Sequence, residues 1–275
     1  MKIVTFTHRN RTRVGELDGE TVYGLTWNDS TVNMIRSGIT KPGRNGERFA
    51  LADVTLEAPL RPGKIVAIGR NYAEHAAETA SPLPEKPLIF AKFPSTVIGT
   101  GAEITWRTSI TNEVDWEVEL AVVIGKKTRD VSEEEATNCV FGYTVANDVS
   151  ARDLQLRQDG QWTRGKSLDT FCPLGPCVVT RGDIADPQNL SLKTSINGEV
   201  VQNGSTSDMH FKVSYLIAYI SRMFTLYPGD IILTGTPSGV GEGMNPKRFL
   251  KDGEEVTVSV ENIGSMTNRC RVIED

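Results

Sequence analysis

Residues 114–125 read VDWEVELAVVIG, a stretch whose two halves differ sharply in polarity. The second half, residues 120–124, is an unbroken apolar run of the kind that fills a buried strand. In the first half, Asp115, Glu117 and Glu119 alternate with apolar residues, and side chains two apart on a strand share a face. One face of a strand that enters a core is therefore predicted to carry three carboxylates.

The segments N-terminal to this strand predict a small β domain. Residues 2–8 and 13–25 read as short strands, with a turn at Asp18-Gly19, and a loose, glycine-rich stretch follows at residues 37–48. The character changes where an apolar strand begins near residue 65. We therefore predict an N-terminal β domain at residues 1–58 and a main domain at residues 59–275.

The main domain reads as α+β and rich in strands. Further strands are expected at residues 65–68, 88–93, 142–147, 175–180, 190–198 and, last in the chain, 254–264. Helices are expected at residues 73–80, from the capping box of Ser132 and Glu135, after residue 148, and at residues 207–224 with Ser207 as N-cap. Because strands outnumber helices and do not alternate with them, the pattern excludes a doubly wound parallel sheet.

Charge and cysteine content place the chain among ordinary globular proteins. It has 275 residues and a formal net charge of -5, which gives no general reason to bind nucleic acid or an anionic membrane. The four cysteines form no Cys-x-x-Cys pair, so reduced structural thiols are expected. No stretch resembles a signal peptide or a membrane span, and we expect a cytoplasmic protein.

The row of carboxylates admits two explanations. Neighbouring same-face residues lie about 6.6 Å apart, and two unpaired carboxylates at that separation repel by roughly 2.5 kcal/mol at an effective dielectric near 20. The face can simply meet water. Alternatively, Glu117, Glu119 and Asp148, an isolated acid after the next strand, bind a hard divalent cation such as Mg²⁺ or Mn²⁺ and leave positions open for substrate. Spacing alone leaves both readings open.

Two further groups carry possible chemistry. His75 and Glu78 are three apart on a predicted helical turn, where they can form either a general base with its orienting carboxylate or a surface ion pair. Lys92 interrupts an apolar strand and Lys166 follows a glycine, so either can neutralise an anionic substrate, although a snorkelling stem also explains Lys92.

A glycine-rich loop follows the strand at residues 230–233. It reads TGTPSGVGEG at residues 234–243 and lacks the Gly-Lys-Ser/Thr ending of a phosphate loop. Its backbone N–H groups can still hold a carboxylate. A tight connection that needs glycine for backbone freedom is the competing explanation.

Several of these motifs together resemble the fumarylacetoacetate hydrolase family. They occur in the family's order: GRNYAEHAAE, PLIFAKFPSTVIG, VDWEVELAVVIGK, GYTVANDVSARDLQ, GKSLDTFCPLGP and ILTGTPSGVG. The resemblance extends from residue 59 to the C-terminus and is closest to the bacterial subgroup that has a small N-terminal β domain. It implies a mixed β-roll, usually a homodimer, with Mg²⁺ or Mn²⁺ as cofactor.

The resemblance also implies roles for individual residues. Glu117, Glu119 and Asp148 match the metal ligands, whereas Asp115 is left as an exposed residue at the start of the strand. His75 and Glu78 match a catalytic pair on a short lid, and Lys166 matches the active-site lysine. The candidates for binding substrate are Arg70, Lys92, Arg152, Gln155 and Thr236.

Members of this family act on 2-oxo acids and their enols, so a small-molecule substrate of that class is expected. We expect first a hydrolase that cleaves a carbon–carbon bond in a 2,4-dioxo acid of the acylpyruvate or fumarylpyruvate type. The alternatives are decarboxylation of oxaloacetate, and isomerisation or tautomerisation of a 2-hydroxydienedioate (2-hydroxyhepta-2,4-diene-1,7-dioate or 5-carboxymethyl-2-hydroxymuconate type) in aromatic degradation. A more remote alternative is a metal-binding protein without catalytic activity.

Overall fold

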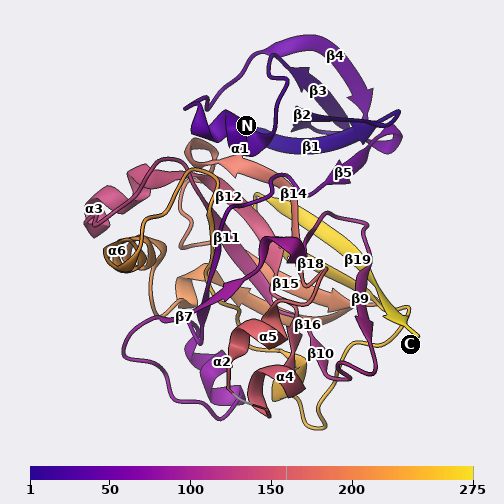
Figure 1. Cartoon of the computed structure of the whole chain (residues 1–275), viewed down its shortest axis with the longest axis vertical. Coiled ribbons are helices and arrows are strands. Elements are labelled where there is room, and N and C mark those ends of the chain that lie inside the picture. Colours follow the sequence, from indigo (N-terminus) through magenta and orange to yellow (C-terminus); the bar gives the residue numbers. More distant parts are fainter. Residues whose placement is uncertain (159, 275) are drawn as a thin grey trace.

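The computed structural model describes residues 1–158 and 160–274, which form a β-rich α+β fold (Figure 1). The N-terminal part holds β1 (Lys2–His8), β2 (Arg11–Asp18), β3 (Thr21–Leu25), α1 (Thr31–Arg36), β4 (Arg44–Ala50) and β5 (Thr55–Glu57). The middle of the chain holds β6 (Ile65–Gly69), α2 (Ala73–Glu78), β7 (Leu88–Lys92), β8 (Val97–Ile98), β9 (Ile104–Arg107), β10 (Val114–Asp115), β11 (Val118–Ile124), α3 (Glu133–Ala136), β12 (Val140–Asn147) and β13 (Ser150–Ala151). The remainder holds α4 (Arg152–Leu156), α5 (Trp162–Lys166), β14 (Cys172–Thr180), β15 (Ser191–Ile196), β16 (Glu199–Ser205), α6 (Val213–Met223), β17 (Ile231–Leu233), β18 (Glu255–Val260) and β19 (Gly264–Ile273).

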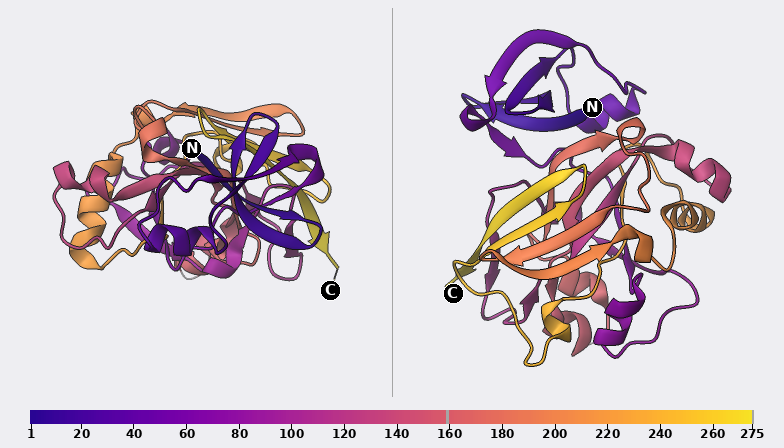
Figure 2. Two further views of the ribbon diagram at one scale, coloured as in Figure 1. Left: turned by 90° about the horizontal axis from the view of Figure 1, so that it is seen from above. Right: turned by 180° about the vertical axis from the view of Figure 1, so that it is seen from behind.

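Two sheets pack against each other around the core. Within the described residues, twelve strands form the large sheet in the order β4-β3-β2-β1-β14-β12-β11-β17-β6-β7, with β5 beside β1 and β8 beside β14. The second sheet runs β16-β15-β18-β19-β9, and its middle strands contact β11, β12 and β14 of the large sheet. The N-terminal strands lie at one end of the molecule and the helices α2, α4 and α5 at the other (Figures 1 and 2).

The apolar run of the opening stretch is β11, and it is buried on both faces. Leu120, Val122 and Ile124 belong to the core between the two sheets, whereas Ala121 and Val123 belong to a second apolar cluster on the opposite face. A strand that is covered on both sides needs apolar side chains at every position, which explains the absence of alternation from residue 120 onward.

The N-terminal part continues the large sheet of the main body. β1 pairs antiparallel with β14, with Lys2 opposite Val179 and Ile3 opposite Val178. The division at residues 58 and 59 therefore remains a proposal about independent folding. The strand β4 occupies residues predicted to form a loose stretch, and that prediction was wrong; six of its seven residues are exposed, so no alternation of apolar and polar side chains announces it.

Two other predictions about secondary structure were wrong. The long helix begins at Val213 and not after Ser207, because the backbone before it pairs elsewhere: the N–H groups of His210 and Phe211 donate to the backbone and side-chain oxygens of Asn71. The strand at residues 255–260 is not the last, since β19 follows it and pairs with both β18 and β9. The capping box of Ser132 and Glu135 is confirmed.

The four cysteines are all free and buried, as structural thiols should be. Burial raises the pKa of Cys172 to about 12, so this thiol resists ionisation.

In the described part of the chain, no helix is both long and apolar enough to cross a bilayer.

The close approach of β12 to β14 gives a prediction for stability. A Cβ atom on Gly142 would lie 2.3 Å from the backbone oxygen of Val179, so Gly142→Ala forces two paired strands apart. We expect a loss of about 2–3 kcal/mol in the free energy of unfolding, measured by urea denaturation. Gly182→Ala is the control, because no atom lies within 4 Å of the added methyl group there. Equal stability of the two variants would contradict the packing of β12 on β14.

Candidate metal centre and active site

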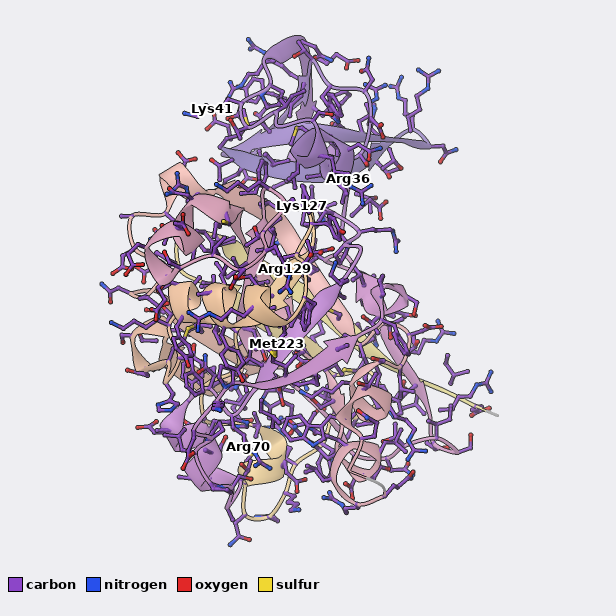
Figure 3. All side chains as sticks on the ribbon, turned by 60° about the vertical axis from the view of Figure 1, so that its left-hand side comes forward. Arg36, Lys41, Arg70, Lys127, Arg129 and Met223 are labelled. Carbon is purple, nitrogen blue, oxygen red and sulfur yellow. The ribbon has the colours of Figure 1, made fainter. Side chains whose placement is uncertain are left out.

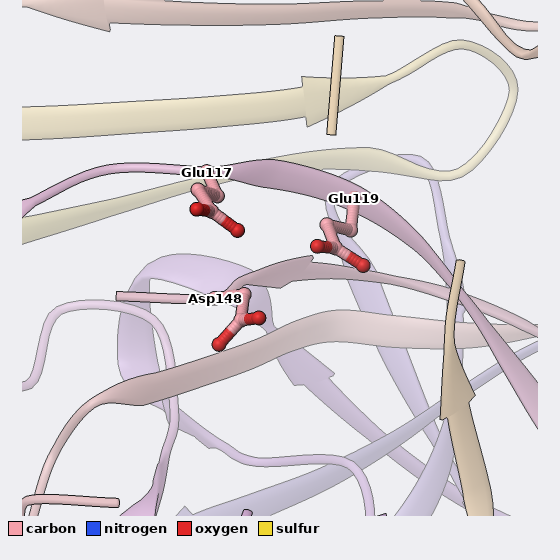
Figure 4. Close-up of side chains that lie close together, drawn as sticks. All are labelled: Glu117, Glu119 and Asp148. Atoms are coloured by element: carbon pink, nitrogen blue, oxygen red, sulfur yellow. The ribbon is translucent and has the colours of Figure 1, made fainter. Parts of the chain in front are cut away.

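Three carboxylates meet where β11 begins and β12 ends (Figure 4). Glu119 is on β11, Glu117 lies one residue before that strand, and Asp148 follows β12. The antiparallel pairing sets Val118 opposite Asn147, and the N–H of Asp148 donates to the backbone oxygen of Glu117 at 2.8 Å. One oxygen from each carboxylate lies within 4.8 Å of the others, and all three residues are buried.

The backbone between Asp115 and Val118 leaves the sheet, so the three acids of the opening stretch do not form one row. β10 ends at Asp115 and pairs with β13, whereas the N–H of Glu117 donates to the side-chain oxygen of Asn147 at 2.9 Å. The prediction that Asp115 is exposed was wrong, because its exposed fraction is 0%. Its carboxylate turns away from the other two and binds Arg152 at 2.7 Å.

Three cations neutralise part of this buried charge. The Nζ atom of Lys166 lies 2.7 Å from Glu117 Oε2 and 2.9 Å from Asp148 Oδ2. Lys92 Nζ lies 2.7 Å from Asp148 Oδ1, and Arg152 Nη1 lies 2.8 Å from Glu117 Oε1. Lys92 is fully enclosed, so a snorkelling stem does not explain it. It supports the acid cluster from the β7 side.

Among the described residues, none forms an ion pair with Glu119, and the Lys166 charge only partly offsets its burial. Burial, followed by the charges of Asp148 and Glu117, raises the pKa of Glu119 well above its usual value. Burial also acts to raise the pKa of Glu117, but Lys166 and Arg152 outweigh it and hold that pKa at about 2. Each ionised acid therefore needs a neighbouring positive charge.

The donor set fits a hard divalent cation. The three residues offer only carboxylate oxygens, which Mg²⁺ and Mn²⁺ prefer. Asp148 Oδ1 is buried, and the contact that it makes is the ion pair with Lys92 Nζ at 2.7 Å. A cation at this point would also compensate Glu119, which otherwise interacts with the N–H of Gly235 at 2.7 Å. The structure is thus consistent with a divalent metal site at Glu117, Glu119 and Asp148.

The pair of His75 and Glu78 lies on α2 beside this cluster. His75 Nδ1 is 2.8 Å from Glu78 Oε1, and Glu78 Oε2 accepts the N–H of Gly239 at 2.8 Å. His75 is buried, so the pair is not an ordinary surface ion pair. Because a carboxylate partner favours the proton on Nδ1, Nε2 carries the lone pair that can accept a proton.

A small cavity of about 120 Å³ joins these groups. Of the residues predicted from the sequence, seven line it: Arg70, His75, Glu117, Arg152, Gln155, Lys166 and Thr236. The lining does not include Glu78, Lys92, Glu119 or Asp148. Eight other lining residues were not predicted as part of the site: Ile68, Gly69, Thr79, Ser81, Phe90, Leu156, Trp162 and Glu242.

Two of the candidate substrate-binding residues have unusual settings. Arg70 has a φ of 56° and extends over the ring of Trp162, with 5.5 Å between the guanidinium carbon and the ring centre. It lies far from Arg36 and Lys41, which belong to the N-terminal part (Figure 3). Thr236 donates its hydroxyl to the backbone oxygen of Val118 at 2.9 Å and accepts from Gln202, so its hydroxyl proton is already used.

A larger cavity, of about 1120 Å³, is elsewhere. It lies in the N-terminal part among α1, β2 and the linker near residue 60, and none of the three clustered carboxylates lines it. Size alone does not identify the reactive site, because chemistry requires the convergent polar groups that the smaller cavity has.

The glycine-rich loop at residues 234–243 holds carboxylates of the protein itself. The N–H groups of Gly235 and Gly239 donate to Glu119 and Glu78, and those of Gly241 and Glu242 donate to Asp115. A Cβ atom on Gly239 would lie 2.1 Å from the backbone oxygen of Val201, so the close approach requires glycine. The loop thereby links the cluster of three carboxylates, the pair of His75 and Glu78, and Asp115.

Comparisons with known proteins match both parts of the chain. The family model for the C-terminal part of fumarylacetoacetate (FAA) hydrolase matches residues 64–271, and the model for the Rv2993c-like N-terminal part matches residues 1–59. The human mitochondrial oxaloacetate tautomerase FAHD2A is 50% identical over 220 residues, which cover 79% of this chain and 70% of that protein.

Solved structures of similar proteins cover the whole fold. Fumarylacetoacetate hydrolase from Exiguobacterium antarcticum is 38% identical, with a TM-score of 0.91 and coverage of 99% of this chain and 100% of that one. 5-Carboxymethyl-2-hydroxymuconate delta-isomerase from Mycobacterium smegmatis is also 38% identical, with a TM-score of 0.84 and the same coverage.

Proposed function

The chain belongs to the fumarylacetoacetate hydrolase family, and from this premise we propose that it is a divalent-metal-dependent tautomerase of a small 2-oxo dicarboxylic acid of the oxaloacetate type. The observation that carries the proposal is that Glu117, one of three buried clustered carboxylates, and His75, an imidazole oriented by a carboxylate, line the same small cavity. Tautomerisation needs a group that stabilises enolate charge and a group that moves a proton to or from carbon, and the two features supply them.

The first step that the site must perform is binding of an acidic substrate. Lys166 and Arg152 line the cavity and carry positive charge, so they attract carboxylates. The cavity of about 120 Å³ is small beside the pockets of roughly 300–1,000 Å³ that enclose drug-sized ligands. Its size therefore favours a compact acid. Mg²⁺ or Mn²⁺ held by Glu117, Glu119 and Asp148 would act as a Lewis acid that stabilises charge on the 2-oxo oxygen.

His75 is the proposed proton carrier. Glu78 engages Nδ1, so Nε2 is left to remove a proton from carbon 3 of the keto form or to return one to the enol. Glu78 is itself held by the N–H of Gly239, and it stabilises the imidazolium that forms while the proton resides on His75. In the enol-to-keto direction, carbon 3 gains one proton and the 2-hydroxyl group loses one, so no water is consumed.

This proposal takes its reaction type from one of the alternatives that the sequence left open, tautomerisation, but with oxaloacetate in place of a 2-hydroxydienedioate, and it does not follow the hydrolysis expected first. A relative at 50% identity is an oxaloacetate tautomerase, and a similar solved structure is an isomerase of a 2-hydroxymuconate. Both names describe proton transfer without addition of water. The keto and enol forms of oxaloacetate are the simplest substrate pair that this chemistry can use.

Cleavage of a 2,4-dioxo acid remains the second candidate. The fumarylacetoacetate hydrolase of Exiguobacterium antarcticum has the same fold with a TM-score of 0.91. His75, oriented by Glu78, is equally able to remove a proton from water, which would then attack the 4-oxo carbon.

The homodimer and the cytoplasmic location expected from the sequence stay predictions; the similar human tautomerase is mitochondrial.

A product assay separates the two candidates. Freshly dissolved enol oxaloacetate is followed by its ultraviolet absorbance with protein and Mg²⁺, and pyruvate is measured in the same samples. We expect the protein to accelerate loss of the enol, excess EDTA to remove the acceleration, and pyruvate to stay at the level of the blank. Pyruvate release from an acylpyruvate without any effect on the enol would contradict tautomerisation and support hydrolysis.

A further inference from the structure

Asp115 has a buried carboxylate with a full set of donors. Oδ1 accepts the N–H groups of Trp116 and Gly241, both at 2.8 Å. Oδ2 accepts the N–H of Glu242 at 3.0 Å and Nε of Arg152 at 2.7 Å. The glycine at 241 permits this approach, because a Cβ atom there would lie 1.8 Å from the backbone oxygen of Arg248. The carboxylate therefore ties the glycine-rich loop to Arg152.

The guanidinium group of Arg152 is held at two of its three nitrogen atoms. Nε is bound by Asp115, and Nη1 contacts Gln155 Oε1 at 2.9 Å and Glu117 Oε1 at 2.8 Å. Nη2 is buried and has no hydrogen-bond partner in the part of the chain that the structure describes. Since a guanidinium group is planar, holding Nε and Nη1 fixes the direction in which Nη2 points.

A buried donor without a partner is costly unless a ligand supplies one. Arg152 lines the small cavity, and its side chain is 4% exposed. A carboxylate oxygen is the partner that best matches a guanidinium N–H. The proposed substrate is a dicarboxylate, so it brings such an oxygen into the cavity.

We propose that Asp115 is a positioning residue. It holds the guanidinium group of Arg152 so that Nη2 donates a hydrogen bond to a carboxylate oxygen of the substrate. The proposal rests on the proposed function for the identity of the substrate. Asp115 itself neither touches the substrate nor binds metal; its N–H partners in the loop anchor it, and Arg152 transmits its effect. Neutralising Asp115 should therefore weaken substrate binding more than it slows the chemical step.

The test is a double-mutant cycle between Asp115→Asn and Arg152→Lys. Lysine keeps the charge at position 152 but lacks the planar fork that Asp115 orients. Binding of malate, a stable four-carbon dicarboxylate, is measured by calorimetry in the presence of Mg²⁺, alongside KM and kcat for oxaloacetate. We expect each single variant to weaken malate binding about tenfold or more, with kcat changed less than KM. The double variant should bind malate no more weakly than Arg152→Lys alone.

Asp230→Asn is the matched control for purely structural loss. Asp230 is also buried, accepts the N–H groups of Lys64 and Tyr227, and pairs with Lys64 Nζ, but it does not line the cavity. Its variant should lower thermal stability and leave malate affinity and KM unchanged. If Asp115→Asn does not fold, Asp115→Glu keeps the charge, displaces the carboxylate by one methylene and should weaken malate binding similarly.

Three results would overturn the inference. One is malate affinity that is unchanged in a folded Asp115 variant, and another is effects of the two substitutions that multiply in the double variant. The third is the absence of malate binding by the unsubstituted protein with Mg²⁺. Failure of the proposed function is distinguishable from these, since it would appear as malate binding without any acceleration of oxaloacetate tautomerisation.

Discussion

Glu119→Gln is expected to abolish the response of the protein to divalent metal. Glutamine has nearly the same shape, and its amide oxygen can still accept the N–H of Gly235, so the fold around β11 should survive. The variant loses one of three anionic donors. Substitutions of residues that merely support metal ligands cost about 10–100-fold in affinity. We therefore expect Mg²⁺ affinity, measured by calorimetry, and metal-dependent turnover to fall by roughly a hundredfold or more.

Thermal unfolding provides the control for this variant. Metal-free Glu119→Gln should be at least as stable as the metal-free parent, because an uncharged amide does not repel Glu117 and Asp148. In the parent, burial is the largest cause of the raised pKa of Glu119, and these two carboxylates are the next largest. Added Mg²⁺ should raise the Tm of the parent and not that of the variant. Full metal-dependent turnover in the variant would show that Glu119 is not a ligand. A lost Tm response with no turnover in the parent would favour a non-catalytic metal protein.

His75→Ala is expected to lower kcat by roughly a hundredfold or more, the usual contribution of a general acid or base. The imidazole lines the cavity, and its Nε2 is free of the Glu78 contact, so it can take a proton and return it. Mg²⁺ affinity should remain nearly unchanged, because His75 is not one of the three clustered carboxylate residues. Turnover of enol oxaloacetate and calorimetric titration with Mg²⁺ measure the two quantities separately.

His8→Ala is the matched control for the histidine substitution. His8 packs against Phe49 in the N-terminal sheet, with 4.9 Å between ring centres, and it does not line the small cavity. Its replacement should leave kcat and Mg²⁺ affinity unchanged. Loss of metal binding in His75→Ala would instead identify His75 as a ligand, and an unchanged kcat would exclude it as the proton carrier.

The sequence predicted the grouping of Glu117, Glu119 and Asp148 because its signal is local. Two acids separated by one apolar residue at the entrance to a fully apolar strand are conspicuous, and the antiparallel pairing of β11 with β12 then brings Asp148 beside them. The strands β6, β7 and β12 and the capping box at Ser132 were predictable for the same reason, since each depends on residues close in sequence. The fumarylacetoacetate hydrolase-like fold and the family are confirmed.

Features that depend on distant partners could not be predicted in this way. Asp115 seemed to belong with Glu117 and Glu119 by spacing, but the break between β10 and β11 sends its carboxylate to Arg152 and to a loop more than a hundred residues away. The start of α6 is likewise set by Asn71, which takes the backbone N–H groups of residues 210 and 211. The enclosure of Lys92 depends on Asp148 across the sheet.

The most direct test of the account is a crystal grown with Mn²⁺ and oxalate, which stands in for the enolate of a 2-oxo acid, with data collected to locate manganese by anomalous scattering. We predict one anomalous peak bounded by oxygens of Glu117, Glu119 and Asp148, with oxalate on its open side facing His75 and without a histidine nitrogen among the ligands. An anomalous peak only at another position, or no peak at saturating Mn²⁺, would contradict the proposed metal centre.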